Sequence, residues 1–476
     1  MQTLYGDSLS KKMDETAQSF YSIPGITLME DASFSTYTII KEKLKNAKKV
    51  VFVAGGGNNG GDALAVARLA FLDGCRNISI LLSDSGKETD LREIQRKACE
   101  KIGLSVTKEA DKALKDADLI VDGLFGIGLK GDPRAPYDEL IEKINKAKAY
   151  VISIDVPSGI GDDVRFSKGI KADETVCMAV PKSAVYLPQN RDLAGIINIS
   201  FPFFPEGAKP ESDIRLLEES DLALKKLRSD DYKKTRGSVA IVGGSGRFTG
   251  AVVLAAKAAF HAGAGLVTIF TEERLIPSIS KAIPSAMVTT YDALKNLDSF
   301  DAVLCGPGMG KDHDDALLYA VDYAKTLVVD ADGIRAFARL KLKAKSKCIM
   351  TPHLGEYAAL LASYCPDKET DTPESWIKTL REVTSKTEST IVVKANTLWI
   401  AGKERKISVV DGQNPSLGVA GSGDVLSGII TALAAHKDDK AAENGTLLHQ
   451  SAGRLAHKKF GFYSSDNLIS FIGKVR

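Results

Sequence analysis

Two glycine-rich stretches limit how this chain can fold, because each leads into a segment with helical apolar spacing. The first is Val50-Val-Phe-Val-Ala-Gly-Gly-Gly-Asn-Asn-Gly-Gly-Asp-Ala63 and the second is Gly418-Val-Ala-Gly-Ser-Gly-Asp-Val-Leu-Ser-Gly428. A small-residue loop at a helix start aims backbone amides at a phosphate. Since each loop also carries an aspartate at the helix entry, the sequence predicts two catalytic centres that act on phosphate-bearing molecules.

Length and composition indicate a globular protein with more than one domain. A chain of 476 residues is long enough for two or three domains. Its apolar share of 44% and its charged share of 26% are ordinary for a soluble protein. A net charge of +2 provides no basic field for nucleic acid. The lysine-rich stretches 41–49 and 341–347 are expected to be solvated faces.

The chain carries no sign of secretion or of a membrane span. No apolar run reaches the roughly 18 residues of a transmembrane helix, and the start of the chain lacks the apolar core of a signal peptide. None of the six cysteines forms a Cys-x-x-Cys pair, so we expect buried, reduced thiols. A cytoplasmic protein that binds neither membrane nor nucleic acid is predicted.

Short apolar runs alternate with helix-periodic segments through the first part of the chain. Strands are predicted at residues 50–54, 78–82, 119–122 and 150–155, and helices at 62–72 and 91–102. This βαβ rhythm predicts a parallel sheet covered on both faces. Ligands of such sheets bind beyond the carboxyl ends of the strands, and residues 55–61, Asp122 and Asp155 fall at that edge.

Residues 201–237 are interpreted as a domain junction, because Phe201-Pro-Phe-Phe-Pro205 and Pro210 interrupt regular structure there. A second series of alternating strands and helices follows this stretch. Strands are then predicted at 238–242, 266–271, 302–305, 327–329, 348–350, 390–394 and 398–401, and helices at 251–262, 424–435 and 441–459. We expect two three-layer α/β/α domains, at residues 1–207 and 215–476.

The first glycine-rich loop matches neither of two common phosphate-binding motifs. It is not the dinucleotide Gly-x-Gly-x-x-Gly fingerprint, and it lacks the Lys and Ser/Thr of a Walker loop. Its glycines permit close backbone approach, although a tight strand-to-helix turn would also explain them. Two more strand-end turns, Asp122-Gly-Leu-Phe-Gly-Ile-Gly-Leu-Lys-Gly-Asp132 and Asp155-Val-Pro-Ser-Gly159, are predicted at the same edge.

Oxygen-bearing side chains gather at this predicted edge. Asp122, Asn59 and Ser158 offer hard oxygen ligands for a cation, and Asp155 is suited to proton transfer. Each aspartate alone would be explained equally well as a helix cap or a turn former. Taken together, these side chains favour a functional site.

Three motifs of this region together resemble the epimerase domain of the NAD(P)H-hydrate repair enzymes, over most of residues 1–205: Asn58-Asn-Gly-Gly-Asp62, Asp122-Gly-Leu-Phe-Gly126 and Asp155-Val-Pro-Ser-Gly159. The resemblance implies a Rossmann-like domain, potassium bound by Asn59, Asp122 and Ser158, and Asp155 as the acid/base candidate. It implies substrate contacts, with phosphates at the first loop, from Asn58, Asn59, Gly60, Gly61, Asp62, Gly126, Ile127, Gly128, Leu129, Lys130, Gly131, Asp132 and Asp155. Ala63 departs from the family, where glycine is common.

A second site is predicted where Gly421-Ser-Gly-Asp424 opens a helix. The loop amides can form an anion nest, and the helix dipole adds positive potential. An aspartate at this place can take a proton from a substrate hydroxyl while the amides stabilise a transferred phosphoryl group. The pairing resembles the phosphoryl-transfer centre of ribokinase-like enzymes, and the alternative is an ordinary aspartate cap.

Further motifs extend the resemblance over about residues 215–476. Gly306-Pro-Gly-Met-Gly310, Asp330-Ala-Asp332, Thr351-Pro-His-Leu-Gly-Glu356 and Lys394-Ala-Asn-Thr397 occur in the order found in the NAD(P)H-hydrate dehydratase domain, a ribokinase-like fold. The resemblance implies that the hydrated nicotinamide contacts Ala251, Gly308, Gly310, His353 and Asp424. It implies that an adenine nucleotide contacts Lys394, Ala395, Asn396, Thr397, Leu398, Gly421, Ser422 and Gly423. Ala395 stands where the family more often has glycine, and Ser422 replaces a frequent threonine.

His353 is favoured as a ligand contact although a lone histidine is more often structural. It lies between Pro352 and Gly355 in a predicted strand-end loop, which is a place where functional residues gather. The remaining histidines have no such setting and no metal-ligand spacing, so no zinc site is predicted; they are His261, His313, His436, His449 and His457.

The combined prediction is a two-domain enzyme that repairs hydrated NADH and NADPH. The first domain would interconvert the R and S epimers at ring carbon six, with Asp155 moving a proton. The second would phosphorylate the S hydroxyl from ADP or ATP, with ADP favoured, using Asp424 as general base. Potassium, magnesium with the nucleotide, and homo-oligomers are expected. The alternatives are a ribokinase-like vitamin or sugar kinase and a nucleotide-binding scaffold without turnover.

Overall fold

The computed structural model describes residues 2–83, 88–246, 248–404 and 406–475. The chain divides into two compact units. The first contains Gln2–Ile214 together with Glu369–Ile377, and the second contains Arg215–Lys368 and the chain from Lys378 onwards. Each unit has α-helices and a largely parallel sheet, so the predicted α/β fold class is confirmed for both.

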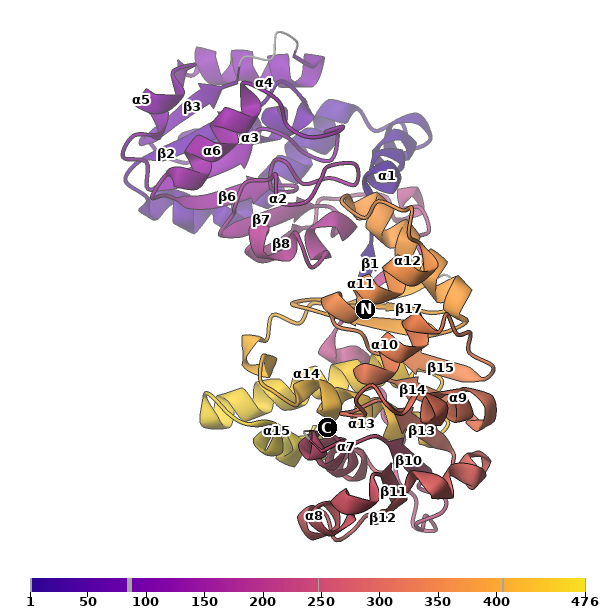
Figure 1. The fold of residues 1–476 in the computed structure, drawn as a ribbon. Helices are drawn as coiled ribbons and strands as arrows, with labels where there is room; N and C mark the ends of the chain where they lie inside the picture. Colours follow the sequence, from indigo (N-terminus) through magenta and orange to yellow (C-terminus); the bar gives the residue numbers. More distant parts are fainter. Residues whose placement is uncertain (1, 84–87, 247, 405, 476) are drawn as a thin grey trace. The chain divides into compact units, whose positions relative to one another are not determined.

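A seven-stranded sheet forms the centre of the first unit (Figure 1). Its order is β4-β3-β2-β5-β6-β7-β8, and each neighbouring pair is parallel. The chain order reverses between β2 and β5, and the crevice beyond the ends of these strands is the usual ligand position of such sheets. The strands are β2 (Val50–Ala54), β3 (Ile78–Leu82), β4 (Ser105–Thr107), β5 (Leu119–Gly123), β6 (Tyr150–Ile154), β7 (Glu174–Met178) and β8 (Ile196–Ser200), and a short strand, β1 (Gln2–Leu4), begins the described chain.

The four strands predicted in this half are present, each within one residue of its predicted ends. β6 ends at Ile154, so Asp155 is the first residue beyond the strand. β4, β7 and β8 were not predicted. β4 has only three residues, and β7 begins with Glu174 and Thr175, which hide its strand character from a search for apolar runs.

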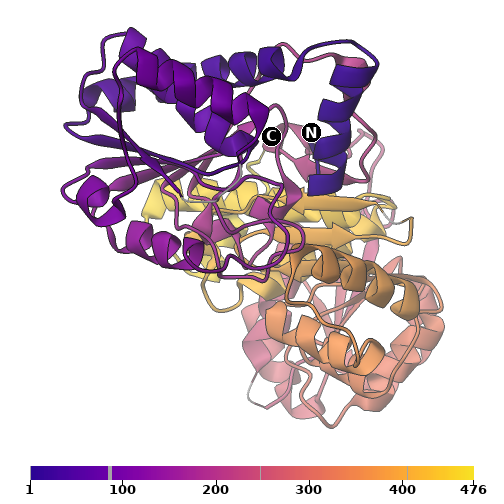
Figure 2. The ribbon, with the colours of Figure 1, turned by 90° about the horizontal axis from the view of Figure 1, so that it is seen from above.

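Helices cover both faces of this sheet, as the βαβ rhythm predicts (Figure 2). Successive strand residues point to opposite faces. Phe52 and Ile80 therefore pack with α2, α3 and α4, whereas Val51 and Leu81 pack with α5 and α6. The helices are α1 (Asp7–Ser19), α2 (Gly25–Asn46), α3 (Asn58–Leu72), α4 (Asp90–Lys101), α5 (Ala110–Leu114) and α6 (Tyr137–Lys146).

Helix α3 begins at Asn58, whereas the sequence predicts its start at Asp62. The glycines before Asp62 disfavour a helix in isolation, which explains the prediction. Packing outweighs that preference: a Cβ on Gly60 would lie 2.0 Å from the carbonyl oxygen of Gly55, so only glycine lets the first helical turn approach the loop so closely. The Asn-Asn-Gly-Gly segment is therefore the helix N-terminus.

The strands of the second unit lie in the order β9-β18-β17-β16-β15-β14-β13-β10-β11-β12. Neighbours from β12 to β16 are parallel, whereas β16, β17 and β18 are antiparallel. The chain order reverses between β10 and β13, which again marks a ligand position. The strands are β9 (Ile214–Leu217), β10 (Ser238–Val242), β11 (Leu266–Thr271), β12 (Met287–Thr290), β13 (Ala302–Cys305), β14 (Thr326–Val329), β15 (Lys347–Met350), β16 (Thr390–Lys394), β17 (Leu398–Ala401) and β18 (Ile407–Val410).

All seven strands predicted in this half are present, each with ends within one residue of the prediction. β9, β12 and β18 have four residues each and were not predicted. β9 lies within the stretch 201–237, which otherwise holds only short 3-10 turns such as Glu206–Ala208 and Glu219–Asp221.

The three helices predicted in this half are confirmed as α7, α13 and α14, which pack on one face of the sheet in a common apolar cluster (Figure 1). α7 and α13 each begin two residues before the predicted start. The helices of the unit are α7 (Thr249–His261), α8 (Ile276–Ala282), α9 (Asp314–Tyr323), α10 (Asp332–Arg339), α11 (Leu354–Tyr364), α13 (Ser422–Ala435), α14 (Ala441–Phe460) and α15 (Ser465–Ile472). Helix α12 (Pro373–Thr387) begins in the segment Glu369–Ile377 of the first unit and ends in the second.

All six cysteines are buried and free, as predicted. Among the described residues, no helix combines the length and the apolar character needed to span a bilayer.

Candidate active sites

The first glycine-rich loop joins β2 to α3 at the crevice between β2 and β5. Gly57 is the N-cap of α3 and brings no side chain to the helix end, so the amides of the first turn are left for another acceptor. Asn58 and Asn59 lie in that first turn. A helix start of this kind binds anions through its amides and its dipole.

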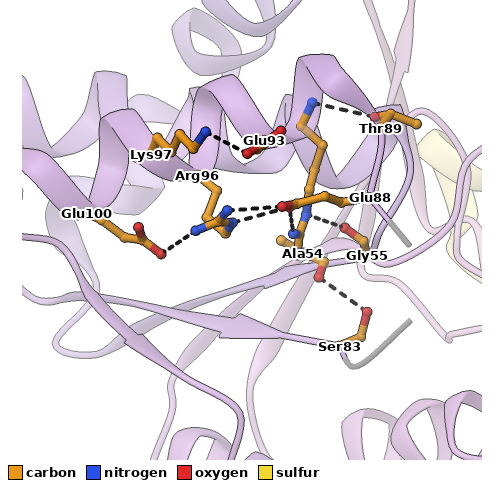
Figure 3. A network of polar contacts seen from close by, with 10 residues as sticks. Ala54, Gly55, Ser83, Glu88, Thr89, Glu93, Arg96, Lys97 and Glu100 are labelled. Carbon is orange, nitrogen blue, oxygen red and sulfur yellow. Dashed lines mark hydrogen bonds and ion pairs between the residues drawn. The ribbon is translucent and has the colours of Figure 1, made fainter. Parts of the chain in front are cut away.

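A polar network on α4 holds the loop in place (Figure 3). The buried Arg92 donates from Nε to the carbonyl oxygen of Gly55 at 3.0 Å, and the amide of Thr89 donates to the carbonyl oxygen of Gly56 at 3.0 Å. Glu88 pairs with both Arg92 and Arg96. The hydrogen bond from Arg96, with help from Arg92, lowers the pKa of Glu88 to about 2. Since two carbonyls of the loop are occupied by these donors, its shape is fixed from outside.

Asp122 and Ser158 form a buried oxygen cluster at the end of β5. The Asp122 carboxylate accepts hydrogen bonds from the hydroxyls of Ser153 at 2.7 Å and Ser158 at 2.6 Å, and from the amide of Ser158 at 2.9 Å. Burial raises the pKa of Asp122, against the lowering effect of the Ser158 hydrogen bonds. The Asn59 amide nitrogen donates to the Ile154 carbonyl at 3.3 Å, and Asn59 Oδ1 is buried without a hydrogen-bond partner.

The Asp155 carboxylate forms a buried ion pair that the sequence did not reveal. Asp155 follows β6 with a φ of 68°, a left-handed backbone conformation that is costly for a residue with a side chain. Its Oδ1 lies 2.7 Å from Nζ of Lys182. Its Oδ2 faces the other way, 3.1 Å from the position that a Cβ on Gly126 would take. One oxygen is thus tied to a cation and the other faces the loop that starts at Gly126.

These elements surround a cavity of about 1060 Å³. The lining includes most of the substrate contacts that the resemblance implies, namely Asn58, Asn59, Asp62, Gly126, Ile127, Gly128, Leu129, Lys130 and Asp155. Gly60 and Gly61 instead support the loop from behind, since added Cβ atoms would meet the Gly55 backbone and the Met29 side chain. Gly131 and Asp132 line a separate cavity of about 670 Å³, where Asp132 pairs with Arg165.

Several carboxyl groups share the large cavity with Asp155. Burial, together with the charge of Asp155, raises the pKa of Asp62 well above its usual value. The Asp7 amide donates to Asp162 Oδ2 at 2.7 Å, and the Asp162 amide donates to Asp7 Oδ2 at 2.8 Å. Burial and the charge of Asp162 raise the pKa of Asp7 to about 8. The cavity therefore holds carboxyl groups whose pKa is raised beside an ion-paired carboxylate.

The second glycine-rich loop opens α13 at the carboxyl edge of the second sheet. Gly421 is the N-cap with a φ of 87°, which favours glycine. Ser422 is buried, and its hydroxyl lies 3.1 Å from Nε2 of His449. Burial lowers the pKa of His449 to about 4, so this histidine is neutral at pH 7. His449 supports the loop from behind, a role that its position in the sequence did not indicate.

Asp424, in the first turn of α13, lies in a cluster of charges. Lys394 Nζ pairs with the buried Asp330 at 2.8 Å and lies 3.3 Å from the position of a Cβ on Gly423. Burial raises the pKa of Asp424 to about 7, with the charge of Asp330 adding to the rise and that of Lys394 opposing it. A carboxyl group with this pKa is suited to accept and return a proton near neutral pH.

The loops after β10 and β13 meet at the point where the strand order reverses. Gly308 has a φ of 57°, and a Cβ there would lie 3.2 Å from Cβ of Ala251. The amide of Gly310 donates to Asp332 at 2.9 Å. The structure thus brings Ala251, Gly308 and Gly310 together, as the resemblance implies.

His353 caps α11 in this structure. Its Nδ1 accepts from the amides of Gly355 and Glu356 at 2.9 and 3.3 Å, and its Nε2 lies 3.2 Å from Oε1 of Glu356. Its side chain is 51% exposed, which leaves the ring within reach of a ligand. His353 also pairs with Lys394 through a backbone bridge, so it borders the charge cluster around Asp424.

The predicted nucleotide segment is the turn of the hairpin formed by β16 and β17. Lys394 pairs with Leu398 across it, and Ala395, Asn396 and Thr397 form the turn. Leu398 is 3% exposed and packs in the apolar core, whereas Thr397 is buried with its hydroxyl oxygen unpartnered. The Leu398 side chain therefore belongs to the core, and its backbone is paired with Lys394 and Val410 in the sheet.

Sequence comparisons match both units. A family model described as NAD(P)H-hydrate dehydratase matches residues 239–474, and one described as YjeF-related protein N-terminus matches residues 25–184. A bifunctional NAD(P)H-hydrate repair enzyme from Coxiella burnetii is 32% identical over 97% of this chain and 96% of its own length. This chain belongs to the bifunctional NAD(P)H-hydrate repair enzymes. The family predicted from the motifs is confirmed.

Other members of the repair-enzyme family are similar over comparable lengths. The Moorella thermoacetica enzyme is 32% identical over 94% of this chain and 92% of its own length, and the Escherichia coli enzyme is 29% identical over 96% and 90%. A solved ribokinase-like superfamily protein from Enterococcus faecalis covers 56% of this chain and 96% of its own length, with a TM-score of 0.51 and 23% identity. Its likeness supports the predicted ribokinase-like fold.

Proposed function

We propose that this protein repairs hydrated NADH and NADPH in two steps, one in each unit. The observation that carries the proposal is that both units place one carboxylate, Asp155 or Asp424, beside a glycine-rich loop at the carboxyl edge of a parallel sheet. In the first unit, the amides at the start of α3 hold substrate phosphate. Oδ2 of Asp155 carries the hydroxyl proton to the ring nitrogen as the carbon–nitrogen bond opens to an aldehyde, and carries it back as the ring closes on the opposite face, which converts R into S.

In the second unit, Asp424 accepts the proton of the S hydroxyl as its oxygen attacks the terminal phosphorus of the nucleotide. The amides of Gly421–Gly423 stabilise the transferred phosphoryl group. The carbon–oxygen bond then breaks, inorganic phosphate leaves, and loss of a proton from the neighbouring ring carbon restores the double bond of NADH or NADPH. Phosphorylation serves this step because phosphate is a far better leaving group than hydroxide.

The oxygen cluster of the first unit fits a potassium ion. Asn59 Oδ1 is buried without a partner, and the buried Asp122 carboxylate is bonded to hydroxyls and amides. Neutral and anionic oxygens of this kind suit a hard cation. Asn59, Asp122 and Ser158 would hold the ion, which would supply fixed positive charge beside the cavity. In the second unit, Lys394 and the Gly421–Gly423 amides would hold ADP or ATP, with magnesium as its counter-ion and ADP the favoured donor.

We also infer a cytoplasmic enzyme that assembles into homo-oligomers. The six buried, free thiols support a reducing compartment. That the chain forms homo-oligomers is inferred from the family resemblance. Light scattering of the purified protein measures the number of subunits.

The deciding experiment incubates the protein with a mixture of R and S hydrated NADH plus ADP, ATP or neither. NADH absorbance should return only with nucleotide, and the R form should be consumed through the S form. Asp155→Asn should stop R-to-S conversion and leave dehydration of pure S substrate intact. Asp424→Asn should slow dehydration at least about a hundredfold. If both activities fall together in each variant, the assignment of one reaction to each unit is wrong.

The same assay tests the alternative of a vitamin or sugar kinase. A kinase releases a stable phosphorylated product and restores no NADH absorbance. A scaffold without turnover would consume no nucleotide, and Asp424→Asn would leave its binding unchanged.

A further inference from the structure

All three N–H groups of the Lys182 ammonium have acceptors, although Lys182 belongs to none of the sequence motifs. Its Nζ donates to the carbonyl oxygens of Met178 at 2.8 Å and Val180 at 3.1 Å, and it pairs with Asp155 Oδ1 at 2.7 Å. These three acceptors match the three N–H groups of a lysine. The side chain is only 3% exposed, so its position is set by these partners.

Burying a lysine is costly unless its charge is compensated. Burial lowers the pKa of Lys182, but the charge and hydrogen bond of Asp155, together with Cys177 and Asp14, outweigh that effect and hold the pKa above its usual value. The ammonium therefore carries its charge at every pH at which the enzyme works, and this charge lies against one oxygen of Asp155.

Asp155 needs such a partner because its other charged neighbours are mostly acidic. Asp62 on α3 and Asp7 and Asp14 on α1 all act on the Asp155–Lys182 pair. Cys177 on β7 and, behind it, Arg191 also lie near the pair. The further titratable residues that line the cavity are Lys11, Lys130, Asp162, Asp163 and Glu374. Like charges favour protonation of a carboxylate. Lys182 is thus the cation that directly contacts Asp155 in a cavity where burial and neighbouring carboxylates raise the pKa of Asp7 and Asp62.

We propose that Lys182 is the positioning residue of the epimerase site: it fixes Oδ1 of Asp155, places a positive charge against that carboxylate within an acidic cavity, and leaves Oδ2 to the substrate. The inference rests on the proposed epimerase function. It explains why Asp155 tolerates its left-handed backbone, since the ion pair and the hydrogen bond from the Asp155 amide to the Val176 carbonyl at 2.8 Å hold the residue from two sides.

The test is the pH dependence of R-to-S conversion, with the uncatalysed rate subtracted, in the wild type and two neutral variants, Lys182→Met and Lys182→Gln. The acid limb of the profile should move to higher pH by about one unit or more in both variants. The rate at pH 6 should fall at least about tenfold, and most of it should return at pH 9. Recovery at high pH also shows that the variant is folded.

Lys182→Arg is the matched control, because it keeps the positive charge. Its acid limb should lie at the same pH as that of the wild type, although its rate of R-to-S conversion is lower. A neutral variant with the wild-type acid limb, whatever its rate, would overturn the inference, because a structural lysine changes the amplitude of the profile and not its position. A wild-type protein that does not interconvert the epimers would instead refute the proposed function itself. Dehydration of S substrate should stay unchanged in all three variants.

Discussion

The dehydration rate should fall as pH is lowered through 7, because Asp424 must be ionised to accept the hydroxyl proton. Its pKa is raised to about 7 by burial, and the charges of Asp330 and Lys394 act in opposite directions. A single group with this pKa is about 90% ionised at pH 8, half ionised at pH 7 and about 10% ionised at pH 6. The kcat/KM for S substrate at pH 8 should therefore be about ten times its value at pH 6.

The assay follows the return of NADH absorbance with pure S substrate and saturating ADP, so that epimerisation does not limit the rate. Two charge variants should move the acid limb of the dehydration rate in opposite directions along the pH axis. Lys394→Met removes a cation that lowers the pKa of Asp424 and should move the limb to higher pH. Asp332→Asn removes an anion that raises this pKa and should move the limb to lower pH. A rate that is flat from pH 6 to 8, or two variants that shift the limb the same way, would refute Asp424 as the base.

Three further results are expected. Gly126→Ala should slow epimerisation by about tenfold or more and spare dehydration, because the new Cβ would lie 3.1 Å from Asp155 Oδ2 and 3.2 Å from Asn59 Cγ; equal rates would contradict the assigned cavity. Replacing potassium by lithium should slow epimerisation by the wild type and have no further effect on Asn59→Ala. If lithium slows both proteins equally, Asn59 is not a potassium ligand. Asp424→Asn should resist urea better than the wild type at pH 8, since a pKa raised from 3.8 to about 7 costs the ionised, folded protein at most about 4 kcal/mol before solvent screening. That gain should shrink as pH falls towards 4, and equal stability at pH 8 would show that the charge is not buried.

Each of the predicted strands either contains a run of at least three apolar residues or is mostly apolar. Val50–Ala54 is buried throughout and reads as a continuous apolar run, as expected of a central parallel strand. β7 escaped the same search because its first residue, Glu174, is charged and yet buried. Its carboxylate pairs with Lys43 at 2.9 Å and accepts from Asn198 at 2.7 Å. Only the folded chain brings those partners to it, so the sequence offers no sign that this position can be buried.

Some residues of the candidate sites could be predicted from the sequence, and others became visible only in the structure. Asp155, Asp122 and Asp424 could be found because aspartates after strands or at helix starts lie at the ligand edge of a parallel sheet. Lys182, Arg92 and His449 could not be found in this way, because each touches its site residue from another part of the chain and follows no spacing rule. His353 was correctly placed in a loop beside a strand end, and its capping bonds became visible only in the structure.

The sequence by itself determined the layered α/β architecture and the glycine-rich loops at its edges, because apolar periodicity and backbone freedom depend on neighbouring residues. The tertiary structure decided which charges surround the acids that those loops carry. Asp155 meets a buried lysine, whereas Asp424 meets both Asp330 and Lys394. Coulomb forces and loss of water act through space, so the charges that set a carboxylate's proton affinity come from residues far away in the sequence.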